Sequence, residues 1–408
     1  MNSLLSINNY YYRRGGAEVV FLEQNALLEQ RGWQVIPLSM RHEKNLPSPW
    51  SDYFVEEIEF GQIQGLAAKL KGAGKIIYSL EARRAVEQLV ARGHVRLAHA
   101  HNVYHHLSPA IFGKLRSLGV PTVLTLHDLK IACPSYKMLS RGQVCERCKG
   151  GALWHAALQR CLKDSLAVSG LAMVESAFQA LVGSYERHVQ RFIVPSRFYI
   201  DKLVEWGWPR GRFTHVPNFI DPALFTPSPT QGEGFLFFGR LSEEKGVATL
   251  IRAAAQARVR LTIVGTGPQE AALKALVESL GAAVDFLGYR SGLALHQAIA
   301  DCRAVVLPSE WYENAPMSVL EAYACGKPVI GARIGGIPEL IREGETGVSF
   351  PSGDVEALAQ AMVRMAAMSE TVRVEMGTAA RRWVEQEFNS ARYIERLLAV
   401  YAELGVRE

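Results

Sequence analysis

The sequence lacks any uninterrupted apolar run that approaches the roughly 18 residues needed to span a bilayer. It also lacks internal repeats and low-complexity stretches, which excludes solenoid and repeat architectures. The first residues, MNSLLSINNYYYRR, show no basic segment followed by an apolar core, so we expect no signal peptide. The net charge of +5 is small, and no interleaving of aromatic and basic residues resembles an RNA-binding motif. A cytoplasmic protein with no nucleic-acid partner is therefore predicted.

What the sequence does contain is a regular alternation of short apolar strands and longer helices. This alternation predicts parallel β-sheets that are covered by helices on both faces. A chain of 408 residues suits two domains rather than one. A segment rich in Pro, Gly and Thr, THVPNFIDPALFTPSPTQGEG, begins at Thr214 and is predicted to link them. A long helical tail is expected over residues 370–404.

Two glutamates eight residues apart, Glu313 and Glu321, lie in the stretch SEWYENAPMSVLEAYACGKPVI. Pro316 suits the first turn of a helix, and Gly326 with Pro328 ends it. Glu313 is therefore expected in the loop before the helix, and Glu321 about one turn inside it, so that both face one pocket. A glutamate on a mostly apolar helix costs free energy unless a polar partner such as a sugar hydroxyl uses it. The alternative is an acidic pair that arises by chance.

Arg240 and Lys245 bracket a predicted strand-to-helix turn in FLFFGRLSEEKGVATLIRAAAQA. Ligands of α/β sheets bind at the carboxyl ends of strands, and a helix N-terminus beside two cations suits a diphosphate. The alternative is a pair of solvated cations that neighbouring glutamates neutralise. Gly265 and Gly267 form a second such turn in LTIVGTGPQEAALKAL, where they would let a nucleoside approach the backbone. Gly-x-Gly turns are, however, common in parallel sheets.

The order of GRLSEEKG, VGTGP, FLGYR, PSEWYENAPMSVLEAYACGKPVI and GGIPELI resembles the C-terminal half of family 4 glycosyltransferases. NNYYYRRGGAEVVFLEQNALLEQRGWQV, LAHAHNVYHHLSP and VLTLHD are similar to the family's N-terminal half. The resemblance implies an α/β protein of the GT-B fold, with two Rossmann-like domains whose parallel sheets face across a cleft. It further implies an acceptor-binding domain over 1–213, a nucleotide-sugar-binding domain over 214–388, and a C-terminal helix over 389–408 that crosses back to the first domain.

The resemblance also implies how the C-terminal half would bind a sugar nucleotide. Arg240 and Lys245 would hold the donor pyrophosphate, and Glu321 would take the ribose hydroxyls. Glu313 would bind hydroxyls of the transferred sugar, with help from the backbone that follows it. That backbone comprises Asn314, Ala315, Pro316 and Met317.

Three further assignments come from the same resemblance. Gly16, at the start of a predicted helix, would bring backbone N–H groups to the donor phosphate or sugar. His127, at the end of the strand in VLTLHD, would lie beside the transferred sugar near the acceptor, whereas its neighbour Asp128 receives no role. Tyr289 or Arg290 would border the nucleobase.

Four of the six cysteines lie close together in the sequence: Cys133, Cys145, Cys148 and Cys161. Their spacing, C-x11-C-x2-C-x12-C, contains a CxxC core that is typical of structural zinc sites. Free thiols remain an alternative, and a reducing cytoplasm disfavours a disulfide. Four cysteines also suit an iron–sulfur cluster, for which sugar transfer has no use. The resemblance is to a bacterial subgroup with a similar cysteine-rich loop.

Histidines are concentrated in LAHAHNVYHHLSP. The spacing of His99 and His101 is that of a strand, so both are predicted to point to one face. Two histidines suggest a metal site, but no carboxylate lies near them in sequence. We therefore interpret His99 as a hydrogen-bonded residue at a strand end. His101 and Asn102 would border the acceptor.

Between residues 62 and 86 the sequence carries five cations and one acid among apolar residues. Such a segment could contact an anionic membrane surface, where each cation contributes about 1 kcal/mol. Gly72 and Gly74 are expected to interrupt any long helix, which favours a solvated helix-loop-helix instead. Peripheral membrane contact at the inner face of the cell membrane is one reading of the segment.

These patterns and the resemblance together predict a retaining glycosyltransferase. It would move a hexosyl group from a UDP- or GDP-sugar to a glycan or lipid-linked acceptor, in bacterial polysaccharide or glycolipid assembly. Glu313, His127, Arg240 and Lys245 would carry the chemistry, because developing charge on the leaving diphosphate can be neutralised without a catalytic divalent metal. The alternatives are a sugar-nucleotide epimerase or a phosphorylase of the same fold, or a non-catalytic sugar-nucleotide or zinc-binding module.

Overall fold

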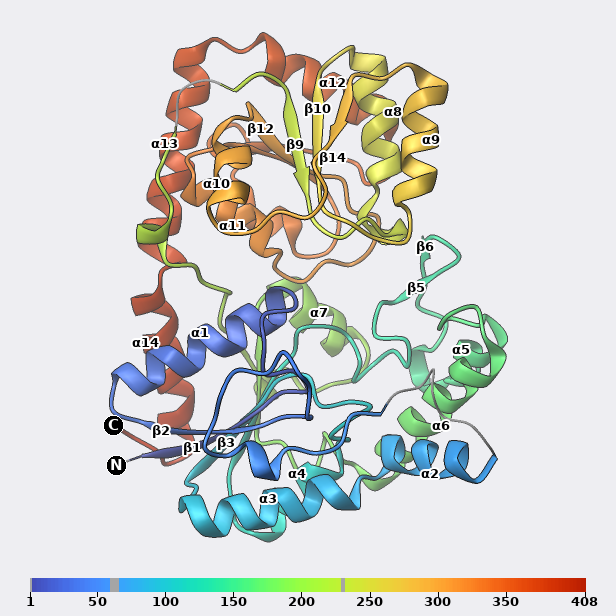
Figure 1. Cartoon of the computed structure of the whole chain (residues 1–408), viewed down its shortest axis with the longest axis vertical. Coiled ribbons are helices and arrows are strands. Elements are labelled where there is room, and N and C mark those ends of the chain that lie inside the picture. The colour runs from blue at the N-terminus through green and yellow to red at the C-terminus, as the bar shows by residue number, and fades with distance from the viewer. Residues whose placement is uncertain (1, 59–65, 229–231) are drawn as a thin grey trace. The chain divides into compact units, whose positions relative to one another are not determined.

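The computed structural model describes residues 2–58, 66–228 and 232–408 (Figure 1). For residues 66–71 it describes the backbone only. The chain divides into two compact units. The first contains Met1–Lys137, Glu146–Val216 and Ile394–Glu408, and the second contains Met138–Cys145 and Pro217–Tyr393. Each unit has a six-stranded sheet in which every strand pair is parallel.

The sheet of the first unit has the order β2-β1-β3-β4-β7-β8. Leu5 of β1 pairs with Ile36 of β2 on one side and with Ala98 of β3 on the other. The strands are β1 (Ser3–Ile7), β2 (Gln34–Leu38), β3 (Leu97–Ala100), β4 (Thr122–Thr125), β7 (Arg191–Val194) and β8 (Phe213–His215). The α-helices that begin in this unit are α1 (Gly16–Gln30), α2 (Leu66–Ile77), α3 (Leu80–Gly93), α4 (Ala110–Ser117), α5 (Trp154–Leu158), α6 (Leu166–Val182) and α7 (Arg197–Glu205).

The sheet of the second unit has the order β11-β10-β9-β12-β13-β14. Its strands are β9 (Phe235–Phe238), β10 (Leu261–Val264), β11 (Val284–Phe286), β12 (Ala304–Leu307), β13 (Val329–Ala332) and β14 (Gly347–Phe350). Its α-helices are α8 (Val247–Ala257), α9 (Glu270–Leu280), α10 (Leu293–Ala300), α11 (Met317–Ala324), α12 (Val355–Ala367) and α13 (Glu370–Glu387). The antiparallel hairpin of β5 (Leu139–Ser140) and β6 (Gln143–Val144) groups with this unit, and α14 (Ser390–Glu403) begins in it and ends in the first.

Strand β9 shows why helices cover both faces of the second sheet. Its successive side chains point to opposite faces, so Phe235 and Phe237 pack with α8 and α12, whereas Leu236 and Phe238 pack with α11 and α13. All four side chains are buried. Every residue of β9 is therefore apolar because the strand faces a hydrophobic core on both sides of the sheet, as the sequence pattern predicts.

In both sheets the strand order reverses beside the first strand of the unit. Strand β1 lies between β2 and β3, and strand β9 lies between β10 and β12. At such a reversal the loops that follow the two strands diverge to opposite faces, which leaves a crevice at their carboxyl ends. The loops after β1 and β3, and those after β9 and β12, are accordingly the places where each unit can bind a ligand.

Three local predictions differ from the structure. The predicted linker starts inside strand β8, and the predicted long tail is two helices, α13 and α14, that break at Phe388 and Asn389. Helix α2 runs through Gly72 and Gly74, because Gly72 is buried and packing offsets the poor helix propensity of glycine. The side chains of the basic segment up to Lys71 lie outside the described residues. Within the described part of the chain, no helix is long and apolar enough to cross a membrane.

Candidate functional site

In the second unit, Lys245 and Glu313 form an ion pair at the reversal of the sheet. Lys245 ends a short 3-10 helix after β9, Glu313 lies in the loop after β12, and the Lys245 ammonium donates to Glu313 Oε1 at 2.7 Å. Ser309 donates its hydroxyl to the same oxygen at 2.7 Å. Trp311 lies beneath the ammonium, which is 5.4 Å from its ring centroid. Glu313 is only 6% exposed, so its charge is held by these donors rather than by water.

Glycines let the loops around this ion pair pack closely: Gly246 in the loop after β9 and Gly335 in the loop after β13 both lie against the loop after β12. Gly246 has a φ of +65°, and a Cβ there would lie 1.9 Å from the carbonyl oxygen of Pro308. Gly335 has a φ of +59°, and its Cβ would lie 2.4 Å from the carbonyl oxygen of Glu313. Gly336 N then donates to that same oxygen at 2.8 Å. A side chain at Gly246 or Gly335 would therefore move the ion pair apart.

Glu321 lies one turn inside α11, as the sequence predicts. The helix begins at Met317, after Pro316 in an extended conformation, and Asn218 Nδ2 fixes the preceding loop by donating to Ala315 O at 2.8 Å. Burial raises the pKa of Glu321 to about 7. A carboxyl group that is costly to ionise, and that remains partly accessible, is poised to accept hydrogen bonds from a ligand.

The other predicted residues of this unit lie at the same carboxyl edge without joining the ion pair. Arg240 follows β9 and is exposed. Gly265 and Gly267 follow β10, and a Cβ on either would lie within 2.3 Å of a backbone oxygen of the loop after β9. Glycine at these two positions thus allows the loops after β9 and β10 to pack closely. A role toward a nucleoside stays a prediction. Tyr289 follows β11 and is 71% exposed.

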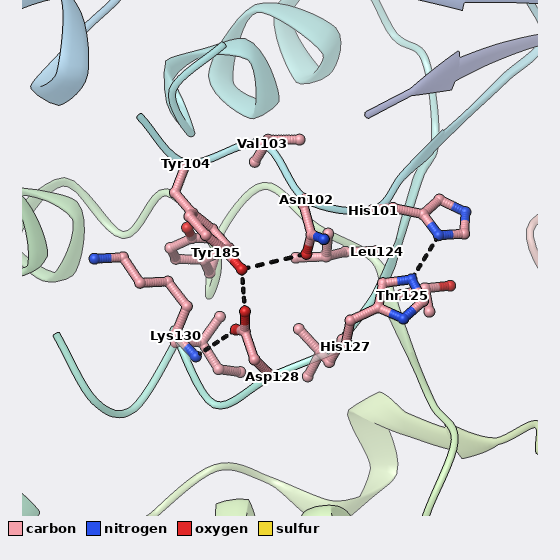
Figure 2. Close-up of a pocket in the computed structure, with 12 residues that line it drawn as sticks. His101, Asn102, Val103, Tyr104, Leu124, Thr125, His127, Asp128, Lys130 and Tyr185 are labelled. Carbon is pink, nitrogen blue, oxygen red and sulfur yellow. Dashed lines mark hydrogen bonds between the residues drawn. The ribbon is translucent and has the colours of Figure 1, made fainter. Parts of the chain in front are cut away.

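In the first unit, a pocket opens at the carboxyl ends of β3 and β4 (Figure 2). His101 and His127 lie side by side there, with stacked rings and 2.8 Å between His101 Nδ1 and His127 Nε2. Burial lowers the pKa of His127 to about 4 and that of His101 well below its usual value. Both imidazoles are therefore neutral at pH 7. Other lining residues are Asn102, Tyr104, Asp128, Lys130 and Tyr185.

His99 has the hydrogen-bonded role that its strand position predicts. Its ring stacks on that of His101 with 4.7 Å between centroids, which confirms that both point to one face. His99 Nε2 lies 2.7 Å from Thr125 Oγ1, and Nδ1 lies 2.7 Å from the Tyr401 hydroxyl. Tyr401 belongs to α14, so His99 joins the C-terminal helix to the sheet.

A polar network closes the other side of the pocket. The Tyr104 hydroxyl donates to Asp128, and Lys130 N donates to Asp128 Oδ1 at 2.9 Å (Figure 2). Burial raises the pKa of Asp128 to about 6, although the hydrogen bond from Tyr104 opposes the shift. The Lys130 ammonium turns away from Asp128 and pairs with Glu175 of α6 at 2.5 Å, and both side chains are almost fully buried.

Gly16 is the first residue of α1 and is exposed, with Gly15 before it in an extended conformation. The N-cap residue Gly15 has no side chain to cap this helix, and the Glu18 carboxylate accepts from the backbone N–H groups of Gly15 and Glu18. Glu18 is buried in the first turn, and burial raises its pKa. The role of Gly16 toward a phosphate or sugar stays a prediction.

The zinc site that the cysteine spacing predicts stays a prediction. Within the described residues, no group of three or more His, Cys, Asp or Glu side chains could hold a metal ion. Cys133 Sγ instead lies 3.2 Å from Ser135 Oγ. Cys145 falls in the segment that groups with the second unit, whereas Cys133, Cys148 and Cys161 belong to the first.

Sequence reasoning missed several residues that complete these sites. Ser309 and Trp311 precede Glu313 in the same loop, so their proximity in sequence was an available signal. Tyr104 lies in the motif that also supplies His101. The pairing of Lys130 with Glu175 had no sequence signal, because 45 residues separate them.

Two doubly wound parallel sheets, each with its polar residues at the carboxyl edge beside the reversal, define an α/β protein of the GT-B fold. The chain belongs to glycosyltransferase family 4. The family model described as Glycosyltransferase Family 4 matches residues 14–224, and the model described as Glycosyl transferases group 1 matches residues 225–383.

Individual relatives agree with this family. The putative colanic acid biosynthesis glycosyltransferase WcaL of Escherichia coli is 30% identical over 223 residues, which are 50% of this chain and 54% of the relative. A GDP-mannose-dependent alpha-(1-6)-phosphatidylinositol monomannoside mannosyltransferase of Mycolicibacterium smegmatis is 30% identical over 213 residues, 46% of this chain and 56% of the relative. The matched part is thus about half the length of these curated relatives.

Among solved structures, the chain is similar to sucrose-phosphate synthase from Thermosynechococcus elongatus. The TM-score is 0.74 at 21% sequence identity, and the match covers 99% of each chain. At this identity the likeness concerns the fold.

Proposed function

We propose that the protein is a retaining hexosyltransferase that uses a UDP- or GDP-sugar. Its acceptor would be a glycan or a lipid-linked glycan in bacterial polysaccharide or glycolipid assembly. The observation that carries this proposal is the cluster of Lys245, Glu313 and Ser309 at the reversal of the second sheet. The names of the two relatives, one for colanic acid and one for a GDP-mannose-dependent enzyme of a glycolipid, support the substrate classes.

The cluster can bind a sugar diphosphate while the hydrogen bonds within it are kept. The Lys245 ammonium has three N–H donors, so it can hold Glu313 and a phosphate oxygen together. Both hydrogen bonds to Glu313 end on Oε1, which leaves Oε2 to accept from a hydroxyl of the transferred sugar. Arg240 would reach the diphosphate from its exposed position, and Glu321 would accept from the ribose hydroxyls.

His127 and the N-terminus of α1 would contact the sugar and the acceptor through uncharged groups at neutral pH. His127, with its lowered pKa, would offer a neutral ring nitrogen to a sugar hydroxyl, and the N-terminus of α1 at Gly16 would offer backbone N–H groups. Backbone groups of 314–317 would complete the sugar site. Gly265, Gly267 and Tyr289 would border the nucleoside.

In the proposed step, the acceptor oxygen bonds to the anomeric carbon on the face from which the diphosphate departs. The bond between the anomeric carbon and the phosphate oxygen breaks, and that phosphate oxygen takes the proton of the acceptor hydroxyl. Configuration is then retained. Lys245 and Arg240 stabilise the charge that develops on the leaving diphosphate, which is where preorganised electrostatics lower a barrier.

The first experiment is a thermal-shift panel of UDP-, GDP-, ADP- and TDP-sugars without added metal. Stabilisation by one nucleotide identifies the donor, because a ligand of the native state raises its stability by mass action. Lys245→Met should abolish that shift. Lys274→Met is the matched control, since Lys274 pairs with Glu270 on the exposed surface of α9.

The radiolabelled donor is then offered with membrane extracts that contain lipid-linked glycans. A labelled glycan whose anomeric configuration matches the donor supports retaining transfer. Donor that is converted without any acceptor product would indicate an epimerase, and donor that binds without turnover would indicate a binding module. No nucleotide response from folded protein would refute the donor site.

Two further expectations belong with this proposal. The enzyme would work in the cytoplasm at the inner face of the cell membrane, where lipid-linked acceptors are found.

The CxxC spacing supports a structural zinc ion. This ion would take no part in sugar transfer. Metal analysis of the purified protein, compared with a Cys145→Ser, Cys148→Ser variant, tests it directly.

A further inference from the structure

Helix α6 exposes apolar residues and buries polar ones, the reverse of an ordinary surface helix. Its sequence, LAVSGLAMVESAFQALV, contains one charged residue, Glu175, which is fully buried against Lys130. Leu166, Val174 and Leu181 are instead 59%, 47% and 77% exposed. A helix on the surface of a soluble domain normally shows polar residues to water. Here the outward side is apolar and the polar residues point inward.

Helical geometry places most exposed residues of α6 on one continuous face, and only Val168 and Ala180 lie off it. Residues three and four apart in a helix lie above one another. The outward face includes Ala167, Gly170, Val174, Ala177 and Leu181, and the buried face includes Ser169, Ala172, Glu175 and Gln179. No charged side chain interrupts the outward face along the seventeen residues of the helix.

Neighbouring elements of the same unit extend this face, and Figure 1 shows α5 and α2 beside α6. On α5, Trp154 is 55% exposed and Leu158 is 64% exposed. Between α2 and α3, the ring of exposed Tyr78 lies edge-on to Phe178 of α6, with 6.1 Å between centroids. Leu80 beside it is 59% exposed. We call the apolar surface formed by these residues and the outward face of α6 the α5–α6 face.

Positive charge borders the α5–α6 face. Arg147, Arg160 and Lys163 are exposed in the segments that precede α5 and α6, and Asp164 is the exposed acid among them. An apolar surface with cations at its rim fits the boundary of an anionic bilayer, where apolar groups enter the acyl region and cations meet headgroups. An exposed tryptophan such as Trp154 favours the same boundary.

We propose that the α5–α6 face docks on an anionic lipid membrane, with α6 lying in the plane of the interface. A second copy of the chain is the competing occupant, but the exposed cations next to this apolar surface favour an anionic partner. The inference rests in part on the proposed function, because a lipid-linked acceptor would be met at such a surface. It goes beyond that function by naming the docking surface and its lipid chemistry.

The test is co-sedimentation of the full chain with vesicles of phosphatidylcholine alone or with added phosphatidylglycerol. We expect binding to the anionic vesicles that falls about tenfold or more in Val174→Glu/Leu181→Glu, because both residues lose apolar insertion. Val363→Glu is the matched control, since Val363 is similarly exposed, at 48%, on α12 of the other unit. Arg160→Glu/Lys163→Glu should remove the preference for anionic lipid while leaving the apolar residues intact.

Three outcomes separate the possibilities. Equal sedimentation of the wild type and Val174→Glu/Leu181→Glu, with the variant folded by circular dichroism, overturns the proposal. A wild-type dimer that this variant converts to a monomer, without vesicle binding, assigns the face to a second copy and also overturns it. Nucleotide-sugar binding measured on the same proteins is independent of this face, so its loss in every sample would count against the proposed function alone.

Discussion

Replacing Glu321 with glutamine should weaken donor binding and stabilise the ligand-free protein at the same time. Both effects have one cause, which is that burial raises the pKa of this carboxyl to about 7. The ligand-free fold disfavours the ionised form, whereas ribose hydroxyls need it as an acceptor. Glutamine keeps the shape of the side chain and removes the charge.

The binding effect can be calculated from the pKa. With a pKa of about 7, roughly one-tenth of the carboxyl is ionised at pH 6 and roughly nine-tenths at pH 8. Wild-type affinity for a sugar nucleotide should then rise about tenfold between these pH values, or about 1.4 kcal/mol. In Glu321→Gln the dependence should vanish, and at pH 8 the variant should bind about 1.5–3 kcal/mol more weakly.

The stability effect has the opposite sign. The folded-state pKa lies above the ordinary value of 4.5, so the wild type loses stability as pH rises from that value through about 7. The shift corresponds to an upper bound of about 3 kcal/mol at pH 8, reduced by the partial contact of the carboxyl with water. The free energy of unfolding of Glu321→Gln in urea should exceed that of the wild type at pH 8 and match it near pH 4.

Isothermal titration calorimetry with the sugar nucleotide identified by the thermal-shift panel measures the binding effect. Asp128→Asn is the control, because Asp128 has a pKa of about 6 and titrates in the same interval. A pH dependence that survives in Glu321→Gln but disappears in Asp128→Asn would refute the assignment. Equal affinity of Glu321→Gln and the wild type at pH 8 would refute it as well.

Three other substitutions test the remaining parts of the site. Lys245→Met should weaken sugar-nucleotide binding by about 1.5–3 kcal/mol in calorimetry, and unchanged affinity would remove Lys245 from the donor site. Lys130→Met should cost about 3–5 kcal/mol in urea unfolding, because it strands the buried Glu175 charge, and Lys130→Met/Glu175→Leu should recover most of the loss. If the double variant is no more stable than Lys130→Met, the pair is not the cause. Gly335→Ala should lower both stability and donor affinity, since its Cβ would meet the backbone of Glu313 at 2.4 Å, and wild-type affinity would contradict this.

The fold, and the placement of Lys245 and Glu313 after strands of the second sheet, could be predicted because their signals are local and regular. Alternating apolar strands and helices indicate parallel sheets, and the start of α11 follows from Pro316 within its own motif. Lys245 and Glu313 are 68 residues apart, yet each follows a strand at the reversal of one sheet. Because the two strands are neighbours in the sheet, the residues that follow them come into contact. The two local motifs were therefore enough to predict that both residues lie at one edge of the sheet.

The rest depends on packing that sequence patterns do not encode. The predicted linker includes the last two residues of strand β8, Thr214 and His215, because this strand is stabilised by pairing with β7 and not by its own composition. The path of α2 through Gly72 depends on burial of that glycine. The cysteine spacing predicted a metal site, but spacing specifies only a turn and not where the other two thiols lie.

The buried pair of Lys130 and Glu175 has a consequence for the orientation of α6. A helix with one charge in seventeen residues has little apolar asymmetry, so many rotations about its own axis would bury similar hydrophobic area. Turning α6 by half a revolution would carry Glu175 into solvent and leave the Lys130 ammonium alone in the interior, at the cost of an unpaired buried charge. The ion pair, together with the hydrogen bonds of Ser169 and Gln179 on the same face, thus fixes the rotation of α6 about its axis. It thereby determines which side chains of the helix are exposed.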